Sequence, residues 1–158
     1  MKVVIIGSGG REHALCHMIK KSTKVKEIFC IPGNAGTSTI AKNIDLDFDN
    51  FELLKKFITK NNIDIVLIGP EKPLVDGLVD FLESYKIKVF GPNKLASKLE
   101  GSKIFTKNIC KKYNIPTANF GVFENTHKAI NFLNECKFPL VIKSDGLASG
   151  KGVYICET

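Results

Sequence analysis

Residues suited to binding an anion follow an apolar run near the start of the chain, in the sequence GSGGREH at positions 7–13. A helical pattern begins there, so backbone N–H groups and the helix dipole would face a bound phosphate, and Arg11 adds a fixed positive charge. The dinucleotide fingerprint G-x-G-x-x-G is not matched, because Glu12 stands where the third glycine belongs. A tight turn without a ligand is the alternative, and we favour phosphate binding.

Two further polar loops, PGNAGT at positions 32–37 and GPEKPL at positions 69–74, follow two other apolar runs. If these runs are parallel strands, all three loops lie at one edge of the sheet, where open α/β folds bind ligands. One arginine and one glutamate among glycines suit a small phosphorylated molecule that carries hydroxyl groups. The glycines could equally form turns, and Glu71 could act only through its charge at the start of the next helix.

A second glycine-rich stretch, SDGLASGKG at positions 144–152, contains Lys151 and lies between two apolar runs, the first of which ends in Lys143. It is not a P-loop, since three residues rather than four separate Gly146 from Gly150 and no Ser or Thr follows the lysine. A hairpin loop that closes over a triphosphate fits better. We expect Lys143 to be buried among apolar neighbours and therefore to need an anionic partner.

Other reactive side chains give weaker signals. His13 and His17 are four residues apart without a third metal ligand, so ordinary helix histidines are favoured and no metal site is predicted. Cys16, Cys30 and Cys156 lie in apolar patterns typical of buried core residues. No nucleophile with a partnering base is recognisable, so the catalytic residues stay unassigned.

The amino-acid composition excludes some classes of protein. Among 158 residues, 23 Lys and Arg oppose 16 Asp and Glu, and the net charge of +7 excludes an acidic tail protein. Residues 93–158 hold 10 basic and 5 acidic groups without interleaved aromatic residues. A solvated helix face, or a surface that attracts anionic small molecules, is therefore favoured over nucleic-acid binding.

Five widely spaced cysteines without a C-x-x-C pair indicate reduced thiols and a cytoplasmic protein. The N-terminal apolar run is too short for a signal peptide or a membrane span.

Alternating apolar and helical patterns supply the elements that position these loops. Runs at 3–6, 27–31, 63–68 and 87–90 predict strands buried on both faces, and patterns at 12–20, 51–58 and 74–82 predict helices between them. This order predicts an α/β fold with an open, parallel, Rossmann-like sheet over residues 1–92.

A different pattern begins after Pro92. Residues 93–115 form a predicted helical connector, with one or two helices over 93–112 that break near Gly101 and a proline directly after residue 115. Residues 116–158 predict the start of a further domain, with a strand at 120–123, a helix at 126–136, and strands at 139–143 and 152–156. The chain stops after a strand that no helix follows, which we interpret as truncation.

Several blocks in order resemble the N-terminal part of the glycinamide ribonucleotide synthetase (phosphoribosylamine-glycine ligase) family, within the ATP-grasp superfamily. They are VIIGSGGREHAL at 4–15, PGNAGT at 32–37, GPEKPLV at 69–75, FGP at 90–92, LEGSKIFTK at 99–107 and VIKSDGLASGKG at 141–152. The resemblance implies a pre-ATP-grasp parallel sheet followed by the beginning of an ATP-grasp nucleotide-binding domain.

The resemblance further implies an enzyme of purine biosynthesis that joins the carboxyl of glycine to the amine of 5-phosphoribosylamine. ATP is cleaved to ADP and phosphate through a glycyl phosphate, with Mg²⁺ as the metal. By the same resemblance, the residues that bind phosphoribosylamine are Gly9, Gly10, Arg11, Asn34, Gly36 and Glu71. Those that bind ATP are Lys103, Lys143, Gly146, Ala148, Ser149, Gly150 and Lys151, and residues 146–152 form a mobile lid.

Members of this family are more than twice as long, and their remaining part carries the magnesium ligands and much of the glycine site. We therefore expect the chain to be inactive alone, because phosphoryl transfer needs the metal. The alternatives are another ATP-grasp ligase with a different acceptor, and a non-catalytic module that binds a nucleotide or metabolite. The sequence leaves open the oligomeric state and whether further purine-pathway domains follow in the full chain.

Overall fold

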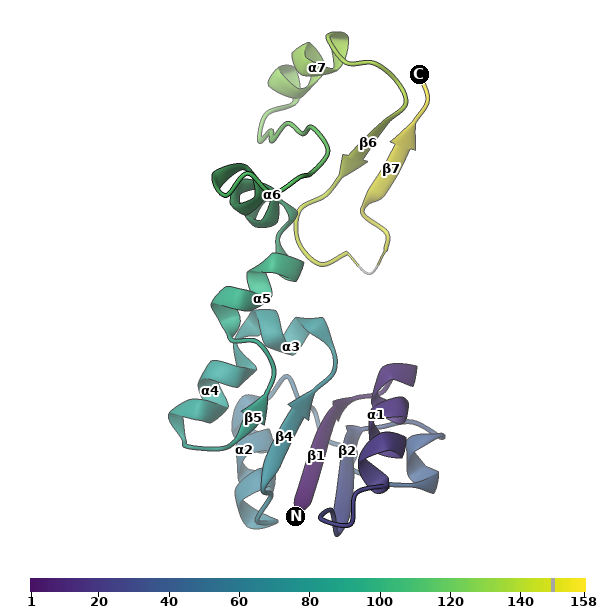
Figure 1. Ribbon diagram of the computed structural model, residues 1–158, viewed down its shortest axis with the longest axis vertical. Helices are drawn as coiled ribbons and strands as arrows, with labels where there is room; N and C mark the ends of the chain where they lie inside the picture. The colour runs from purple at the N-terminus through teal and green to yellow at the C-terminus, as the bar shows by residue number, and fades with distance from the viewer. Residues whose placement is uncertain (149) are drawn as a thin grey trace. The chain divides into compact units, whose positions relative to one another are not determined.

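The computed structural model describes residues 1–148 and 150–158 (Figure 1). The chain divides into two compact units, Met1–Ser97 and Lys98–Thr158, and the division falls within helix α5 (Lys94–Gly101). The domain boundaries expected at residues 92 and 115 stay predictions.

The first unit is built on a five-stranded parallel sheet with the strand order β3-β2-β1-β4-β5. The strands are β1 (Lys2–Gly7), β2 (Glu27–Pro32), β3 (Lys42–Asn43), β4 (Ile65–Ile68) and β5 (Val89–Phe90). The predicted α/β class, the open parallel sheet and its four strands are confirmed. The edge strand β3 was not predicted, because its two polar residues carry no apolar pattern.

Helices connect the strands of this sheet. They are α1 (Gly10–Lys20), α2 (Phe51–Lys60), α3 (Glu71–Asp76) and α4 (Leu78–Ser84), with a 3-10 turn η1 (Thr37–Thr39). The single helix predicted over residues 74–82 is wrong, since Gly77 has a left-handed φ of 99° and divides it into α3 and α4. Because α3 begins at Glu71, only Gly69 and Pro70 separate it from β4.

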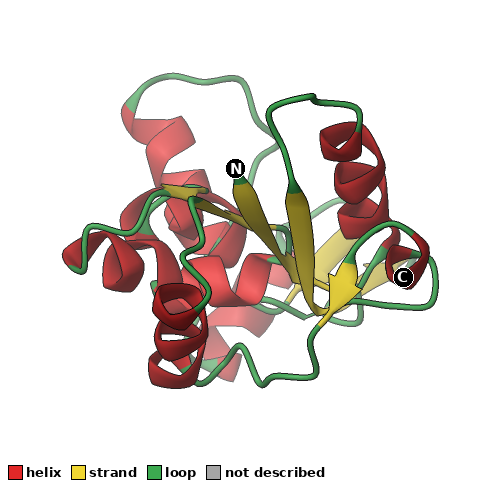
Figure 2. Ribbon diagram, turned by 90° about the horizontal axis from the view of Figure 1, so that it is seen from below, coloured by secondary structure: helices red, strands yellow, loops and turns green. Residues whose placement is uncertain are grey.

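Helices cover both faces of the first sheet (Figure 2). On one face Val4 of β1 packs with Leu54 of α2 and Leu78 of α4, while on the other its neighbour Ile5 packs with Cys16 of α1. All five side chains are fully buried. Each buried aliphatic side chain of this kind contributes about 1.5–3 kcal/mol, so the apolar strand β1 is held firmly between two helical layers.

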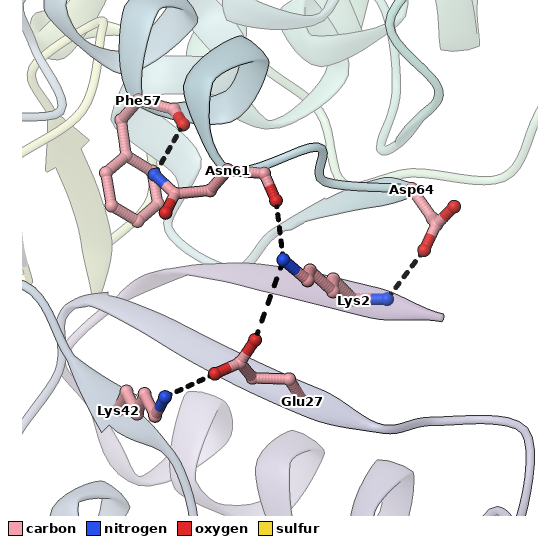
Figure 3. A network of polar contacts seen from close by, with 6 residues as sticks. All are labelled: Lys2, Glu27, Lys42, Phe57, Asn61 and Asp64. Atoms are coloured by element: carbon pink, nitrogen blue, oxygen red, sulfur yellow. Dashed lines mark hydrogen bonds and ion pairs between the residues drawn. The ribbon is translucent and has the colours of Figure 1, made fainter.

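A polar network lies at the amino-terminal edge of the sheet (Figure 3). Lys2 donates its backbone N–H to Asp64 (N to Oδ2, 2.6 Å) and its ammonium group to the carbonyl of Asn61 (3.0 Å). The same ammonium lies 3.9 Å from Glu27, whose carboxylate also pairs with Lys42. The charged groups at this edge therefore tie neighbouring strands together, whereas the glycine-rich loops lie at the opposite, carboxyl-terminal edge.

The second unit contains α6 (Lys103–Lys112), α7 (Thr126–Asn134) and an antiparallel pair, β6 (Leu140–Lys143) with β7 (Val153–Cys156). The hydroxyl of Ser102 accepts a hydrogen bond from the N–H of Phe105 and caps α6, which confirms the helix break predicted near Gly101. The strand predicted at residues 120–123 is wrong. Phe123 packs instead on Phe132 of α7, with ring centroids 5.0 Å apart. The apolar residue at this position therefore makes an aromatic contact and does not form a strand.

The β6–β7 hairpin differs from the strands of the first sheet because its side chains are largely accessible. Ile142 is 46% exposed and Ile155 is 73% exposed. Lys143 is exposed as well, and Cys156 is only partly buried. The expectation that Lys143 and Cys156 are buried is therefore wrong, since neither face of this two-stranded ladder is closely covered within the described part of the chain.

Candidate functional site

Three loops follow β1, β2 and β4 at the carboxyl-terminal edge of the first sheet. The β1 loop (residues 7–10) enters α1, whose N-cap is Gly9. Glu12 turns back and accepts a hydrogen bond from the Gly9 N–H (N to Oε2, 2.6 Å), and this residue is only 4% exposed. A buried carboxylate thus satisfies one of the N–H groups that the start of a helix leaves without an intrahelical partner.

Arg11 connects the β1 loop to the β4 loop (residues 69–70) and to the start of α3. Its guanidinium donates to the carbonyl of Gly69 (Nη1 to O, 2.5 Å) and to the carboxylate of Glu71 (Nη2 to Oε1, 2.8 Å). The hydrogen bond from Arg11 lowers the pKa of Glu71 below its ordinary value of 4.5, so this carboxylate is charged at neutral pH. Both charged side chains keep enough exposure, at 60% and 43%, to meet a ligand.

Asn34, in the β2 loop (residues 33–37), supports the β1 loop from the other side. Its side-chain amide donates to the carbonyls of Ser8 (2.7 Å) and Gly9 (3.2 Å). Its Oδ1 accepts a hydrogen bond from the Thr37 N–H (2.9 Å). Asn34 therefore fixes the conformation of two loops at once.

Gly36 lies against the first helix. A Cβ at this position would come within 2.6 Å of the imidazole ring of His13, so glycine lets the β2 loop approach α1 closely. This packing explains Gly36 without a ligand.

A pocket of about 380 Å³ lies between the β1 and β4 loops. Its lining residues are Gly7, Ser8, Gly9, Gly10, Arg11, Glu12, Phe48, Pro70 and Glu71. The structure thus brings together four of the predicted substrate-binding residues (Gly9, Gly10, Arg11 and Glu71), whereas Asn34 and Gly36 lie outside the lining.

Two lining residues escaped the sequence analysis. Glu12 stands three residues after the N-cap, a spacing that favours a carboxylate which caps the helix and that could have indicated this contact. Phe48 precedes α2 in an irregular segment, and no local pattern places it at the sheet edge.

In the second unit, the start of α6 contacts the loop at residues 144–152, which joins β6 to β7. This loop contains the lid predicted at residues 146–152, and we refer to it as the lid loop. Asp145 accepts hydrogen bonds from the N–H of Ile104 (3.2 Å) and the hydroxyl of Ser102 (3.0 Å). Burial acts to raise the pKa of Asp145, but these hydrogen bonds outweigh it and lower the pKa below its ordinary value. Lys103 donates from Nζ to the carbonyl of Gly146 (2.8 Å), so two consecutive residues of the lid loop are held at the N-terminus of α6.

The other residues predicted to bind ATP lie on the lid loop or beside it. Lys143, Gly150 and Lys151 are exposed, while Gly146 and Ala148 are partly buried. Ser149 lies outside the described residues. The structure therefore brings Lys103 to Gly146 and leaves the ammonium-bearing side chains of Lys143 and Lys151 accessible.

Within residues 1–148 and 150–158, no three His, Cys, Asp or Glu side chains gather in a way that could hold a metal ion. None of the helices in this described part is both long and apolar enough to cross a bilayer.

Family models match the chain in two consecutive segments. Residues 1–100 match the phosphoribosylglycinamide synthetase N domain, and residues 101–158 match the phosphoribosylglycinamide synthetase ATP-grasp (A) domain. The resemblance carried by the sequence blocks is thereby confirmed.

Two curated relatives are each named phosphoribosylamine-glycine ligase. The protein of Clostridium acetobutylicum is 48% identical over 157 residues, which cover 99% of this chain and 38% of the relative. That of Caldanaerobacter subterraneus is 49% identical over 155 residues, which cover 98% and 37%. The chain therefore spans less than half the length of the curated relatives it matches.

Solved structures agree with the sequence comparison. The crystal structure of phosphoribosylamine-glycine ligase from Thermotoga maritima matches with a TM-score of 0.78 at 35% identity, over 100% of this chain and 36% of that one. The biotin carboxylase domain of Hydrogenobacter thermophilus 2-oxoglutarate carboxylase, solved with MgADP, matches with a TM-score of 0.77 over 99% and 37%; its 19% identity shows a shared fold alone. Because both segments match in order over the whole sequence, the chain belongs to the phosphoribosylglycinamide synthetase family.

Proposed function

We propose that this chain forms the N-terminal part of an ATP-dependent carbon-nitrogen ligase that joins glycine to 5-phosphoribosylamine. The products would be glycinamide ribonucleotide, ADP and phosphate, in a cytoplasmic step of purine biosynthesis. The observation that carries the proposal is the pocket of about 380 Å³ in which Arg11, Glu71 and the start of α1 meet. Pockets of this size hold small-molecule ligands, and the family to which the chain belongs supplies their identity.

The pocket would bind phosphoribosylamine from two sides. Because the Gly9 N–H is already bonded to Glu12, we assign the phosphate to the Gly10 end of the β1 loop, beside the charge of Arg11. A Cβ at Gly10 would meet no atom within 4 Å, so this end of the loop faces open space. The charged carboxylate of Glu71 would accept hydrogen bonds from the ribose hydroxyl groups or the amine. Asn34 and Gly36 would act indirectly, by fixing the loops.

The second unit would bind ATP through the lid loop. Lys103, Lys143 and Lys151 would neutralise phosphate charge that moves during transfer, and Gly146, Ala148, Ser149 and Gly150 would cover the triphosphate. A closed lid would also exclude water from glycyl phosphate, which water would hydrolyse. The exposure of Lys143 and Lys151 supports this assignment, because both ammonium groups are accessible to an anion.

Magnesium is the proposed metal, and when bound it would supply further neutralisation of the ATP phosphates. Since the described residues contain no cluster of metal ligands, we assign no residue of this chain to the metal. The metal ligands and the glycine site would come from other parts of such an enzyme.

Product formation by the full-length protein tests the proposal. ADP should appear only when ATP, glycine and phosphoribosylamine are all present. ADP formation with a different amine or acid would support the alternative of another ATP-grasp ligase. Melting-temperature shifts with ATP and ribose 5-phosphate but no ADP under any condition would support a non-catalytic binding module.

A further inference from the structure

Glu12 lies where two loops meet. Its carboxylate accepts the Gly9 N–H, and glycines of both the β1 and the β4 loop surround its side chain. A Cβ placed on Gly7 would lie 2.7 Å from Cδ of Glu12, and one on Gly9 would lie 3.0 Å from Oε2. A Cβ placed on Gly69 would lie only 2.0 Å from Oε1, so the β4 loop also depends on glycine at this point.

The backbone of Gly69 is fixed on both sides of this contact. Its N–H donates to the carbonyl of Ile6 (3.1 Å), and its carbonyl accepts from Arg11 (2.5 Å). Gly69 therefore has little room to move away from Glu12. The buried side chain of Glu12 cannot swing outward without losing its hydrogen bond to Gly9.

We propose that Glu12 is a positioning residue whose buried carboxylate sets the spacing between the β1 loop and the β4 loop. It thereby sets the shape in which Gly10, Arg11 and Glu71 meet the phosphorylated sugar. The identity of that ligand rests on the proposed function, whereas the spacing of the loops does not. On this proposal, the absence of a Cβ at positions 7, 9 and 69 leaves room for the side chain of Glu12, and not for a closely approaching ligand.

The charge of Glu12 also bears on where an anion binds. In the first turn of α1 the carboxylate interacts favourably with the positive end of the helix dipole. A phosphate at the Gly9 amide would compete with this carboxylate and be repelled by it. The Gly10 and Arg11 side of the pocket is the one that suits the phosphate.

A double-substitution cycle tests the spacing without any ligand. Gly69→Ala should lower the melting temperature, because the new methyl group displaces Glu12. In a Glu12→Ala background the same Gly69→Ala substitution should cost much less, since the atom it would strike is gone. Equal losses in the two backgrounds would overturn the proposal.

Glu52→Ala is the matched control for this cycle. Glu52 is an acidic residue in the first turn of α2, and its side chain is 56% exposed. Gly69→Ala should cost as much in this background as in the unsubstituted protein. If Glu12→Ala does not fold, Glu12→Asp, one methylene too short to reach Gly9, replaces it in the cycle.

Binding of ribose 5-phosphate, measured below the melting temperature of every variant, tests the effect on the ligand. Glu12→Gln keeps the length of the side chain and an acceptor oxygen, so this variant should retain most of the affinity for ribose 5-phosphate. Glu12→Ala should bind about tenfold more weakly, which corresponds to about 1.4 kcal/mol, close to the lower bound of about 1.5 kcal/mol for one hydrogen bond to a charged group. In the full-length protein, the KM for phosphoribosylamine should rise while the KM for ATP stays the same.

The outcomes separate this inference from the proposed function. If Glu12→Ala binds ribose 5-phosphate as tightly as the unsubstituted protein does, Glu12 is not a positioning residue. If the unsubstituted protein binds no ribose 5-phosphate but the cycle shows coupling, the proposed ligand is wrong and the role of Glu12 in spacing the loops stands.

Discussion

Arg11 and Glu71 lie 60 residues apart in the sequence and form an ion pair, with Nη2 2.8 Å from Oε1. The same guanidinium binds the carbonyl of Gly69, so one side chain at the start of α1 holds two groups that follow β4. The carboxyl-terminal edge of the sheet thus presents a fixed pair of opposite charges. Such a pair suits a ligand that carries both an anionic phosphate and hydrogen-bond donors.

Arg11→Lys should weaken the binding of ribose 5-phosphate even though the positive charge is kept. Lysine lacks the planar fork that reaches Gly69 and Glu71 together, so we expect a loss of about 1–2 kcal/mol of binding free energy by calorimetry. Lys60→Arg, at the exposed end of α2, is the control and should bind normally. If Arg11→Lys binds ribose 5-phosphate normally, the guanidinium of Arg11 does not contribute to the ligand site.

Acid should break the charge pair of the pocket. Arg11 lowers the pKa of Glu71 below 4.5, so the stabilisation is complete above that pH and is lost as the pH falls through the lower pKa of the folded state. Since both side chains are partly exposed, the contribution is below about 1 kcal/mol. Urea unfolding of the unsubstituted protein and of Glu71→Gln should differ at neutral pH and converge as the pH falls below 4.5 and Glu71 takes up a proton in the folded state. A gap that does not change with pH would show that the ion pair adds no stability.

Asp145 should hold the lid loop at the N-terminus of α6. Asp145→Ala removes the acceptor for the Ile104 N–H and the Ser102 hydroxyl, so amide hydrogen exchange at Ile104 should become faster. The expected loss of stability is about 0.5–1 kcal/mol, as for other helix N-terminal acceptors. Asp145→Asn keeps an acceptor oxygen and should show a smaller effect. Unaltered exchange at Ile104 in Asp145→Ala would mean that the contact does not persist in solution.

Lys143→Ala should weaken the use of ATP without unfolding the hairpin, because this side chain is exposed and packs little. We expect the KM for ATP in the full-length protein to rise about tenfold, the equivalent of one charge-assisted contact. Lys137→Ala, which removes another exposed lysine of the same unit, should leave this KM unchanged. An unchanged KM in Lys143→Ala would exclude Lys143 from the nucleotide site.

The cysteines should divide into two classes by reactivity. Burial, with Cys30 as neighbour, raises the pKa of Cys16 to about 12, and burial also raises the pKa of Cys30. Alkylation needs the thiolate, so iodoacetamide at about pH 8 should spare both in the folded protein. Mass spectrometry should find label on the partly buried cysteines of the second unit, Cys110, Cys136 and Cys156.

The buried thiol of Cys16 should also make the free energy of unfolding depend on pH in the alkaline range. Because the pKa of Cys16 is higher in the folded protein than its ordinary value of 9.0, its contribution to stability is complete below pH 9 and is lost as the pH rises toward 12. Rapid labelling of Cys16 in the folded protein would contradict the burial on which this prediction depends.

The first unit was predictable because its strands are buried on both faces, so β1, β2 and β4 appear as short apolar runs. Other elements lacked such a signal. Strand β3 is defined by its neighbour β2 rather than by its own two residues. The apolar residues near Phe123 fitted a strand pattern, but an aromatic contact with α7 uses them instead.

The part of the candidate site that follows from the sheet topology could be predicted from the sequence. Loops after parallel strands must meet at one edge, and the structure indeed places Gly10, Arg11 and Glu71 around one pocket. The capping contact of Glu12 was not predicted, because the usual capping-box pattern has Ser or Thr at the N-cap and glycine stands there in α1. The exposure of Lys143 depends on what packs over β6, which a local apolar pattern does not encode.

Incorporation of isotopically labelled glycine by the full-length protein tests the central claim most directly. The account predicts that label enters a phosphorylated ribose product only when ATP and phosphoribosylamine are both present, with ADP formed in equal amount. Glycine incorporation that does not need phosphoribosylamine, or ADP formed without any glycine incorporated, would contradict it.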